Sequence, residues 1–253
     1  MGRTILITGA TGQQGGATLR SLVEHNKSTS NPINLLALTR NATSDKAKPL
    51  SSLPNVKVIQ GDLTKKDEIE KIFEDEKIDS VFSIQDNFQG NEVEQGTNLT
   101  EVAIKYNVKH FVYTGVDLAG QNPSLVPHFE TKRQIEEHLI KNSSRIASQI
   151  LISQGEKEEF KNQIINLSGD SHTVSEIIDT FKQVKQVDLV QDENVDIVPY
   201  LTIALATING HGWEVNPEST QRLFPFVKDL KGWLETEFNP DFAAGGFGTM
   251  SNN

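Results

Sequence analysis

Three glycines near the start of the chain are spaced in a way that suits phosphate binding. Gly9, Gly12 and Gly15 follow the apolar run 5–7, and a helix-like stretch from Ala17 to His25 comes after them. A strand that turns through glycines into a helix lets a pyrophosphate approach the backbone, where N–H groups and the helix dipole favour negative charge. The pattern predicts a dinucleotide-binding turn. The alternative, a turn that serves packing alone, is disfavoured by the strand and helix that flank it.

The end of the second predicted strand indicates which dinucleotide this turn would favour. Residues 33–39 are apolar and almost continuous, as in a buried parallel strand, and Arg40 follows them. NAD sites usually carry Asp or Glu at this point for the ribose 2′-hydroxyl, whereas an arginine accommodates the 2′-phosphate of NADP. The planar guanidinium suits bidentate phosphate contact. The position of Arg40 after the glycine turn therefore favours NADP over the alternative of a solvated arginine at a strand end.

Composition excludes several classes of protein. The 253 residues carry a formal net charge of −10, which disfavours direct binding to nucleic acid through its phosphates. Cysteine is absent, so disulfides, thiolate catalysis and cysteine-ligated metals are excluded, and no metal site is expected. No apolar run approaches the ~20 residues that span a bilayer, and we expect no signal peptide before the first strand. We expect a cytoplasmic protein without membrane contact, with a nuclear location as the alternative.

The elements that must position these residues alternate between strand and helix. Such alternation predicts an α/β fold, a Rossmann-type doubly wound parallel sheet with a smaller C-terminal α/β lobe. We expect a dinucleotide-binding domain over residues 1–144 and a reduced lobe over residues 145–253, together forming one continuous structural unit. The predicted strands are 5–7, 33–39, 55–61, 78–84, 108–114 and 163–167. The predicted helices are 17–25, 65–75, 92–106, 129–141, 145–151, 174–181 and 217–238, the last interrupted near Pro225.

Several short segments resemble the NmrA-like family, atypical members of the short-chain dehydrogenase superfamily. They are Thr8–Gly16, Leu38–Arg40, Gln60–Leu63, Val93–Gly96, His110–Tyr113 and His128–Lys132, and a weaker match includes Leu167–Asp170 and Gly232–Leu234. The resemblance implies a Rossmann fold that prefers NADP. It also implies that Thr11, Gln13, Gln14, Asp62, Leu63 and Lys132 join the glycines and Arg40 in binding the cofactor. Some family members sense the NADP/NADPH ratio and bind regulatory proteins, and others are quinone or related reductases.

The catalytic residues of typical short-chain dehydrogenases are only partly present. Those enzymes use a tyrosine four residues before a lysine, and no tyrosine of this chain stands in that relation. Lys132 resembles the lysine, and His128 stands where the tyrosine would be. A His128–Lys132 pair on one helix face could transfer protons near neutral pH. In the alternative, which we favour, His128 packs the start of the helix and Lys132 only binds ribose. Thr114 stands in the region of the catalytic serine.

Two departures from the family bear on function. Glu94 stands where members often carry a lysine that assists cofactor binding. After Lys141 a family segment is missing, including the sixth strand and much of the substrate pocket, and its loss is expected to affect stability or oligomeric state. We therefore predict an NADP(H)-binding protein with a redox-sensing or regulatory role and a protein partner. The alternatives are an NADPH-dependent oxidoreductase acting on a quinone or small carbonyl compound, and a degenerate protein that binds neither cofactor nor substrate.

Overall fold

The computed structural model describes residues 2–86, 90–116, 123–124, 126–142, 174–186, 218, 222 and 229–236. The chain divides into two compact units, residues 1–164 and residues 165–253. The predicted helix 145–151 and strand 163–167 lie outside the described residues, as do the expected domain boundary at 144 and the point of the missing segment.

Five parallel strands form the sheet of the first unit, in the order β3-β2-β1-β4-β5. Their bounds are β1 Thr4–Ile7, β2 Asn34–Thr39, β3 Val56–Gln60, β4 Ser80–Ser83 and β5 His110–Tyr113. In the register, Ile7 pairs with Ala37 of β2 on one side and with Phe82 of β4 on the other. The order reverses between β1 and β4, which is the arrangement of a Rossmann-type fold. The predicted α/β class is confirmed.

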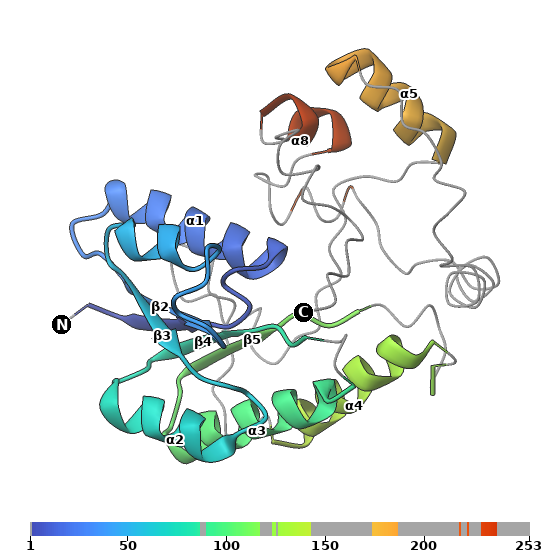
Figure 1. Cartoon of the computed structure of the whole chain (residues 1–253). Helices are drawn as coiled ribbons and strands as arrows, with labels where there is room; N and C mark the ends of the chain where they lie inside the picture. The colour runs from blue at the N-terminus through green and yellow to red at the C-terminus, as the bar shows by residue number, and fades with distance from the viewer. Residues whose placement is uncertain are drawn as a thin grey trace. The chain divides into compact units, whose positions relative to one another are not determined.

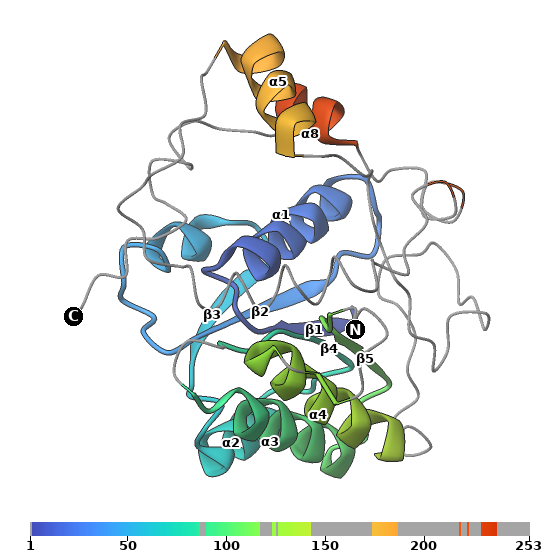
Figure 2. The same ribbon diagram turned by 90° about the vertical axis from the view of Figure 1, so that its right-hand side faces the viewer.

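Helices cover both faces of this sheet (Figures 1 and 2). One face carries α1 (Gln13–Lys27), and the other carries α2 (Lys66–Asp75), α3 (Glu92–Lys105) and α4 (Pro127–Asn142). Helices α1, α2 and α3 each return the chain from the carboxyl end of one strand to the start of the next, as parallel pairing requires, and α4 follows β5.

The two-residue period of β1 divides the core into two layers. Ile5 and Ile7 are fully buried in the cluster that contains Leu19 of α1, whereas Leu6, between them, lies in the cluster that contains Ile69 and Leu99. Successive side chains of a strand point to opposite faces, so a strand buried on both faces is apolar throughout. This double burial fixes the strand ends that carry the candidate site.

Some boundaries differ from those expected. Helix α1 begins at Gln13 instead of Ala17, so Gly15 and Gly16 lie in its first turn. A short 3₁₀-helix, η1 (Lys48–Ser52), was not predicted. Asn55 has a φ of 60° just before β3, a left-handed conformation that asparagine tolerates better than most residues.

The second unit is described only in part. Helices α5 (Val174–Lys185) and α8 (Leu230–Thr236) pack against each other, and Leu234 is fully buried. The predicted helix 174–181 is confirmed and extends to Lys185, and α8 lies within the predicted 217–238. Among the described helices of both units, none is long and apolar enough to cross a membrane.

Candidate dinucleotide-binding site

The predicted site residues gather at one edge of the sheet. Parallel strands all end at the same side, and ligands of open α/β sheets bind there, outside the carboxyl ends of the strands. Thr8 follows β1, Arg40 follows β2, Asp62 follows β3, Asp86 lies shortly after β4, and Thr114 follows β5. We call this edge, with these five residues, the carboxyl edge. Thr8 and Thr114 are 106 residues apart in the sequence and are thereby placed at the same edge of the sheet.

The glycine turn has the geometry that its spacing predicts. Gly9 has a φ of 59°, and its carbonyl accepts a hydrogen bond from the Gly12 N–H at 2.9 Å. A Cβ added at Gly15 would lie 2.3 Å from the Gly9 oxygen, so helix and turn approach too closely for any side chain there. Gly12 is exposed, and a Cβ there would meet only the Gly9 oxygen, at 3.2 Å. Gly15 therefore serves packing, while Gly12 leaves the surface of the turn open.

The start of α1 can accept an anion. Gly12 is the N-cap and supplies no side-chain hydrogen bond, and the first turn contains no acidic residue. The side chains of Gln13 and Gln14 are exposed beside it, and Thr11 is half-buried. The N–H groups at the beginning of a helix carry partial positive charge, which attracts phosphate. The turn thus fits the pyrophosphate of a dinucleotide.

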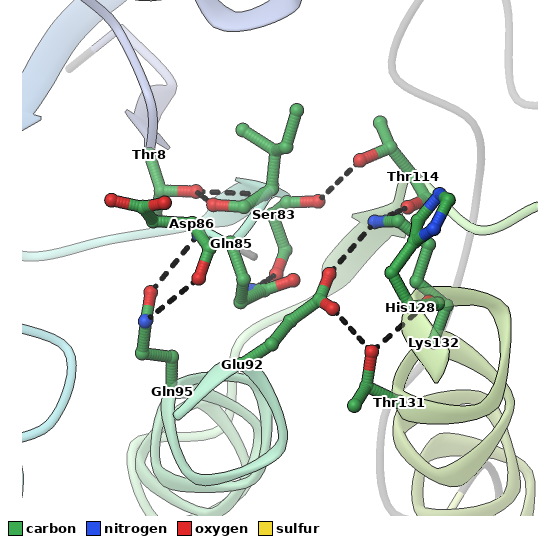
Figure 3. Close-up of polar contacts among 11 residues, drawn as sticks. Thr8, Ser83, Gln85, Asp86, Glu92, Gln95, Thr114, His128, Thr131 and Lys132 are labelled. Atoms are coloured by element: carbon green, nitrogen blue, oxygen red, sulfur yellow. Dashed lines mark hydrogen bonds and ion pairs between the residues drawn. The ribbon is translucent and has the colours of Figure 1, made fainter. Parts of the chain in front are cut away.

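Arg40 lies at the carboxyl edge, as predicted, and is engaged by an acid. Its Nη2 lies 2.9 Å from Oδ2 of Asp86, and the two side chains are 53% and 27% exposed. Asp86 is itself held by its backbone, because its N–H donates to Oε1 of Gln95 and its carbonyl accepts from Nε2, both at 3.2 Å. Figure 3 shows this amide bridge between the segment after β4 and α3.

Asp62 and Leu63 border the same edge, but Asp62 also stabilises its own turn. Its Oδ1 accepts hydrogen bonds from the backbone N–H of Thr64 at 2.9 Å and from the Thr64 hydroxyl at 2.8 Å. The backbone hydrogen bond from Thr64 is the main cause that holds the pKa of Asp62 below its usual value. Leu63 is buried in the core cluster that includes α2. A role of either residue at a cofactor remains a prediction.

A buried ion pair occupies the other end of the carboxyl edge. Nζ of Lys132 on α4 lies 3.1 Å from Oε1 of Glu92 at the start of α3, with side chains that are 14% and 2% exposed. Nζ also donates to the backbone carbonyl of Thr114 at 3.2 Å. The second carboxylate oxygen, Oε2, accepts a hydrogen bond from the Thr131 hydroxyl. In Figure 3 these four residues join α3, α4 and the end of β5.

His128 lies one helical turn before Lys132, as the sequence predicted, and Figure 3 shows both at the carboxyl edge. Burial lowers the pKa of His128, and the positive charge of Lys132 acts in the same direction against the opposing effect of Glu92. The lowered pKa favours the neutral imidazole and makes it a weaker base than a solvated histidine. Its ring also packs edge-on against Phe129, with centroids 4.6 Å apart.

Tyr113 comes near Lys132 in space although it is not four residues before it in sequence. Nζ of Lys132 lies 5.6 Å from the centre of the Tyr113 ring. Burial raises the pKa of Tyr113, and the nearby carboxylates of Glu92 and Glu136 raise it further. This is the reverse of the activation that the dehydrogenase tyrosine receives from its lysine, so the described residues provide no activated tyrosine.

Two acidic residues of the site were missed at the level of sequence, Asp86 and Glu92. Glu92 could have been found, because an acid at the start of a helix, directly before the Val93–Gly96 segment, stands close to the carboxyl edge. Asp86 carries no such signal, since its partner Arg40 lies 46 positions away in the sequence. Glu94, the departure from the family, is exposed. The described residues contain no group of three or more potential metal ligands.

The order of the strands and the glycine turn define a Rossmann-type protein. More narrowly, the chain belongs to the NmrA-like family, whose model matches residues 1–153. An NmrA-like family domain-containing protein of Dictyostelium discoideum is 32% identical over 146 residues, which are 55% of this chain and 45% of that protein. The match thus spans less than half the length of that relative.

Solved structures show the same fold. Nmra, a negative transcriptional regulator, has a TM-score of 0.73 at 14% identity, over 98% of this chain and 99% of that chain. Its complex with NADP has a TM-score of 0.73 at 16% identity, over 97% and 98% of the two chains, and a complex with NAD is also known. Triphenylmethane reductase of Citrobacter sp., complexed with NADP(H), has a TM-score of 0.64 at 19% identity, over 92% and 100%.

Proposed function

We propose that this protein binds NADP(H) at the carboxyl edge of its sheet and acts as a redox-sensing regulator. The observation that carries the binding proposal is the open glycine turn at Gly12, with the start of α1 behind it and Arg40 beyond the next strand. The turn would hold the pyrophosphate, and the guanidinium would contact the 2′-phosphate. The complexes of Nmra with NADP and of triphenylmethane reductase with NADP(H) support this assignment.

Calorimetric titration of the purified protein with NADPH, NADP, NADH and NAD tests this proposal. A charge-assisted contact between Arg40 and phosphate is worth about 1.5 kcal/mol or more, so NADP should bind about tenfold more tightly than NAD. Arg40→Asp should erase or reverse that preference. Lys27→Asp is the matched control, because Lys27 is an exposed cation at the far end of α1. Equal affinities of the unmodified protein for NADP and NAD would contradict the proposed preference.

The proposal of a regulatory role depends on the surroundings of Lys132. Its ammonium group already has two partners, Glu92 and the Thr114 carbonyl, and no activated tyrosine lies beside it among the described residues. Hydride transfer also needs a substrate held about 3–3.5 Å from the nicotinamide in a shielded pocket. The segment that would cover it is the one predicted to be missing. We infer that the protein binds NADPH and signals the redox state of this cofactor to a protein partner.

The second candidate, an NADPH-dependent oxidoreductase for a quinone or small carbonyl compound, is favoured by one observation. His128, Lys132 and Thr114 lie together at the carboxyl edge (Figure 3). Loss of NADPH absorbance in the near ultraviolet, followed over a panel of quinones and carbonyls, separates the two candidates. We expect negligible turnover. Robust turnover that disappears in Lys132→Ala, while that variant still binds NADPH, would establish the oxidoreductase instead.

A further inference from the structure

The ion pair between Arg40 and Asp86 spans the strand that carries the glycine turn. Arg40 follows β2 and Asp86 lies shortly after β4, and β1 lies between those two strands in the sheet. Neighbouring strands lie about 4.8 Å apart, so the pair reaches across about 10 Å of the carboxyl edge. The guanidinium that would receive a 2′-phosphate is therefore already bound to an anion of the protein itself.

The carboxylate of Asp86 is held in place for this contact. Its backbone N–H and carbonyl are both bonded to the side-chain amide of Gln95, which is 6% exposed and which also donates to Asn91 at 2.6 Å. A buried amide that fixes the backbone on both sides limits how far Asp86 can withdraw. Displacing the carboxylate from Arg40 thus leaves a negative charge close to the incoming phosphate.

From this geometry we propose that Asp86 is a second specificity-determining residue, an internal anion that competes with the 2′-phosphate for Arg40 and so weakens discrimination between NADP and NAD. The inference rests on the proposed binding function. NADP must displace Asp86 before Arg40 can bind its phosphate. NAD presents a neutral 2′-hydroxyl, so the ion pair persists when NAD binds. Asp86 therefore does not lower the affinity for NAD.

The size of the effect follows from the exposure of the pair. Exposed ion pairs contribute up to about 1 kcal/mol, which corresponds to a change in affinity of up to about fivefold. Asp86→Asn removes the charge with little change of shape and keeps the backbone bonds to Gln95. We expect it to raise NADP affinity about two- to fivefold and to leave NAD affinity within about twofold.

The experiment is a set of calorimetric titrations with NADP and NAD on the native protein, Asp86→Asn, Arg40→Ala and the double variant. Asp45→Asn is the matched control, because Asp45 lies in the segment after β2 but pairs with Lys48 and is 97% exposed. Competition predicts that Asp86→Asn raises NADP affinity only when Arg40 is present, and that Asp45→Asn changes nothing.

Three results would overturn the proposal. They are an unchanged NADP/NAD affinity ratio in Asp86→Asn, an equal gain in the Arg40→Ala background, and an equal gain from Asp45→Asn. If the native protein and Asp86→Asn bind neither nucleotide, the proposed function itself fails. Binding of NADP without any effect of Asp86 rejects only this inference.

Discussion

Two ion pairs at the carboxyl edge differ in what they can contribute. Arg40–Asp86 is solvent-exposed, so water screens it and its arginine stays available to a ligand. Lys132–Glu92 is almost completely buried, so each charge depends on the other to offset the cost of leaving water. The exposed pair is therefore suited to exchange with a phosphate, and the buried pair is suited to fix α3, α4 and the end of β5 relative to one another.

Neutralising Lys132 should lower the free energy of unfolding more than neutralising Glu92 does. Lys132→Met leaves the carboxylate of Glu92, which is 2% exposed, without its counter-charge, and we expect a loss of about 3 kcal/mol in the free energy of unfolding. Glu92→Gln should lose only about 1–2 kcal/mol, because the amide oxygen still accepts from Thr131 and Lys132 can move toward solvent. Urea denaturation at pH 7 measures both losses.

The double variant Glu92→Gln/Lys132→Met supplies the control. It removes both charges, so its stability should recover above that of Lys132→Met alone. If the effects of the two single substitutions simply add, the two groups do not stabilise each other as an ion pair.

The carboxylate of Glu130, in the first turn of α4, predicts a dependence of stability on pH. The guanidinium of Arg133 lowers the pKa of Glu130 to about 2, with help from Gln134 and the backbone N–H of Ser124. The pKa in the folded state lies below that of the unfolded chain, so the stabilisation is present above about pH 4.5 and is lost as the pH falls toward 2. Glu130→Gln should thus be less stable than the native protein at pH 7, with a difference that shrinks below pH 4.5.

Carbon-13 NMR of the glutamate carboxyl groups measures the Glu130 titration directly. Glu24, an exposed glutamate on α1, is the control group in the same spectrum. A midpoint for Glu130 at the usual value near 4.3 would show that its contacts with Arg133 do not persist in solution.

At this scale the sequence locates the candidate site residues better than their interaction partners. The glycines, Arg40 and Lys132 could be identified because each stands at a fixed distance from a strand end or in a short motif. Asp86 and Glu92 could not be paired with them, because contacts across the sheet and between helices join residues far apart in sequence. The lowered pKa of His128 also depends on its burial, which sequence spacing does not give.

Among the elements, the glycine turn predicts that a substitution at Gly12 affects nucleotide binding, whereas one at Gly15 affects stability. Gly12→Val places a side chain on the exposed surface of the turn and should abolish nucleotide binding with little change in circular dichroism. Gly15→Val should instead destabilise the fold, because even a Cβ would lie 2.3 Å from a backbone oxygen that cannot move aside cheaply. Titration calorimetry and thermal denaturation of both variants test this separation. Retained affinity in Gly12→Val would mean that the turn is only structural.

Element types were predictable because double burial and amphipathicity leave clear periods in the sequence. The five strands and the helices α2, α3 and α4 lie within two residues of their expected bounds. The sequence pattern puts the start of α1 four residues too late, because glycines are poor helix formers and their presence masks the first turn. Close approach to the preceding turn overrides that propensity. The 3₁₀-helix η1 has too few residues to leave a period.

For the whole molecule, nucleotide binding should raise the free energy of unfolding and therefore the Tm. Anything that binds only the folded state stabilises it by RT ln(1 + [L]/Kd), which is about 2.7 kcal/mol when NADP is present at a hundred times its Kd. Domains of this size gain about 2–4 °C in Tm per kcal/mol, so the expected shift is about 5–10 °C. NAD at the same concentration as NADP should give a smaller shift, and Arg40→Asp should abolish the difference between the two. Differential scanning calorimetry of the full chain measures these shifts, with AMP as a control that lacks the pyrophosphate and the 2′-phosphate. A Tm unchanged by NADP, NADPH, NAD and NADH alike would favour the third alternative, in which the NmrA-like fold is kept while the binding function has been lost.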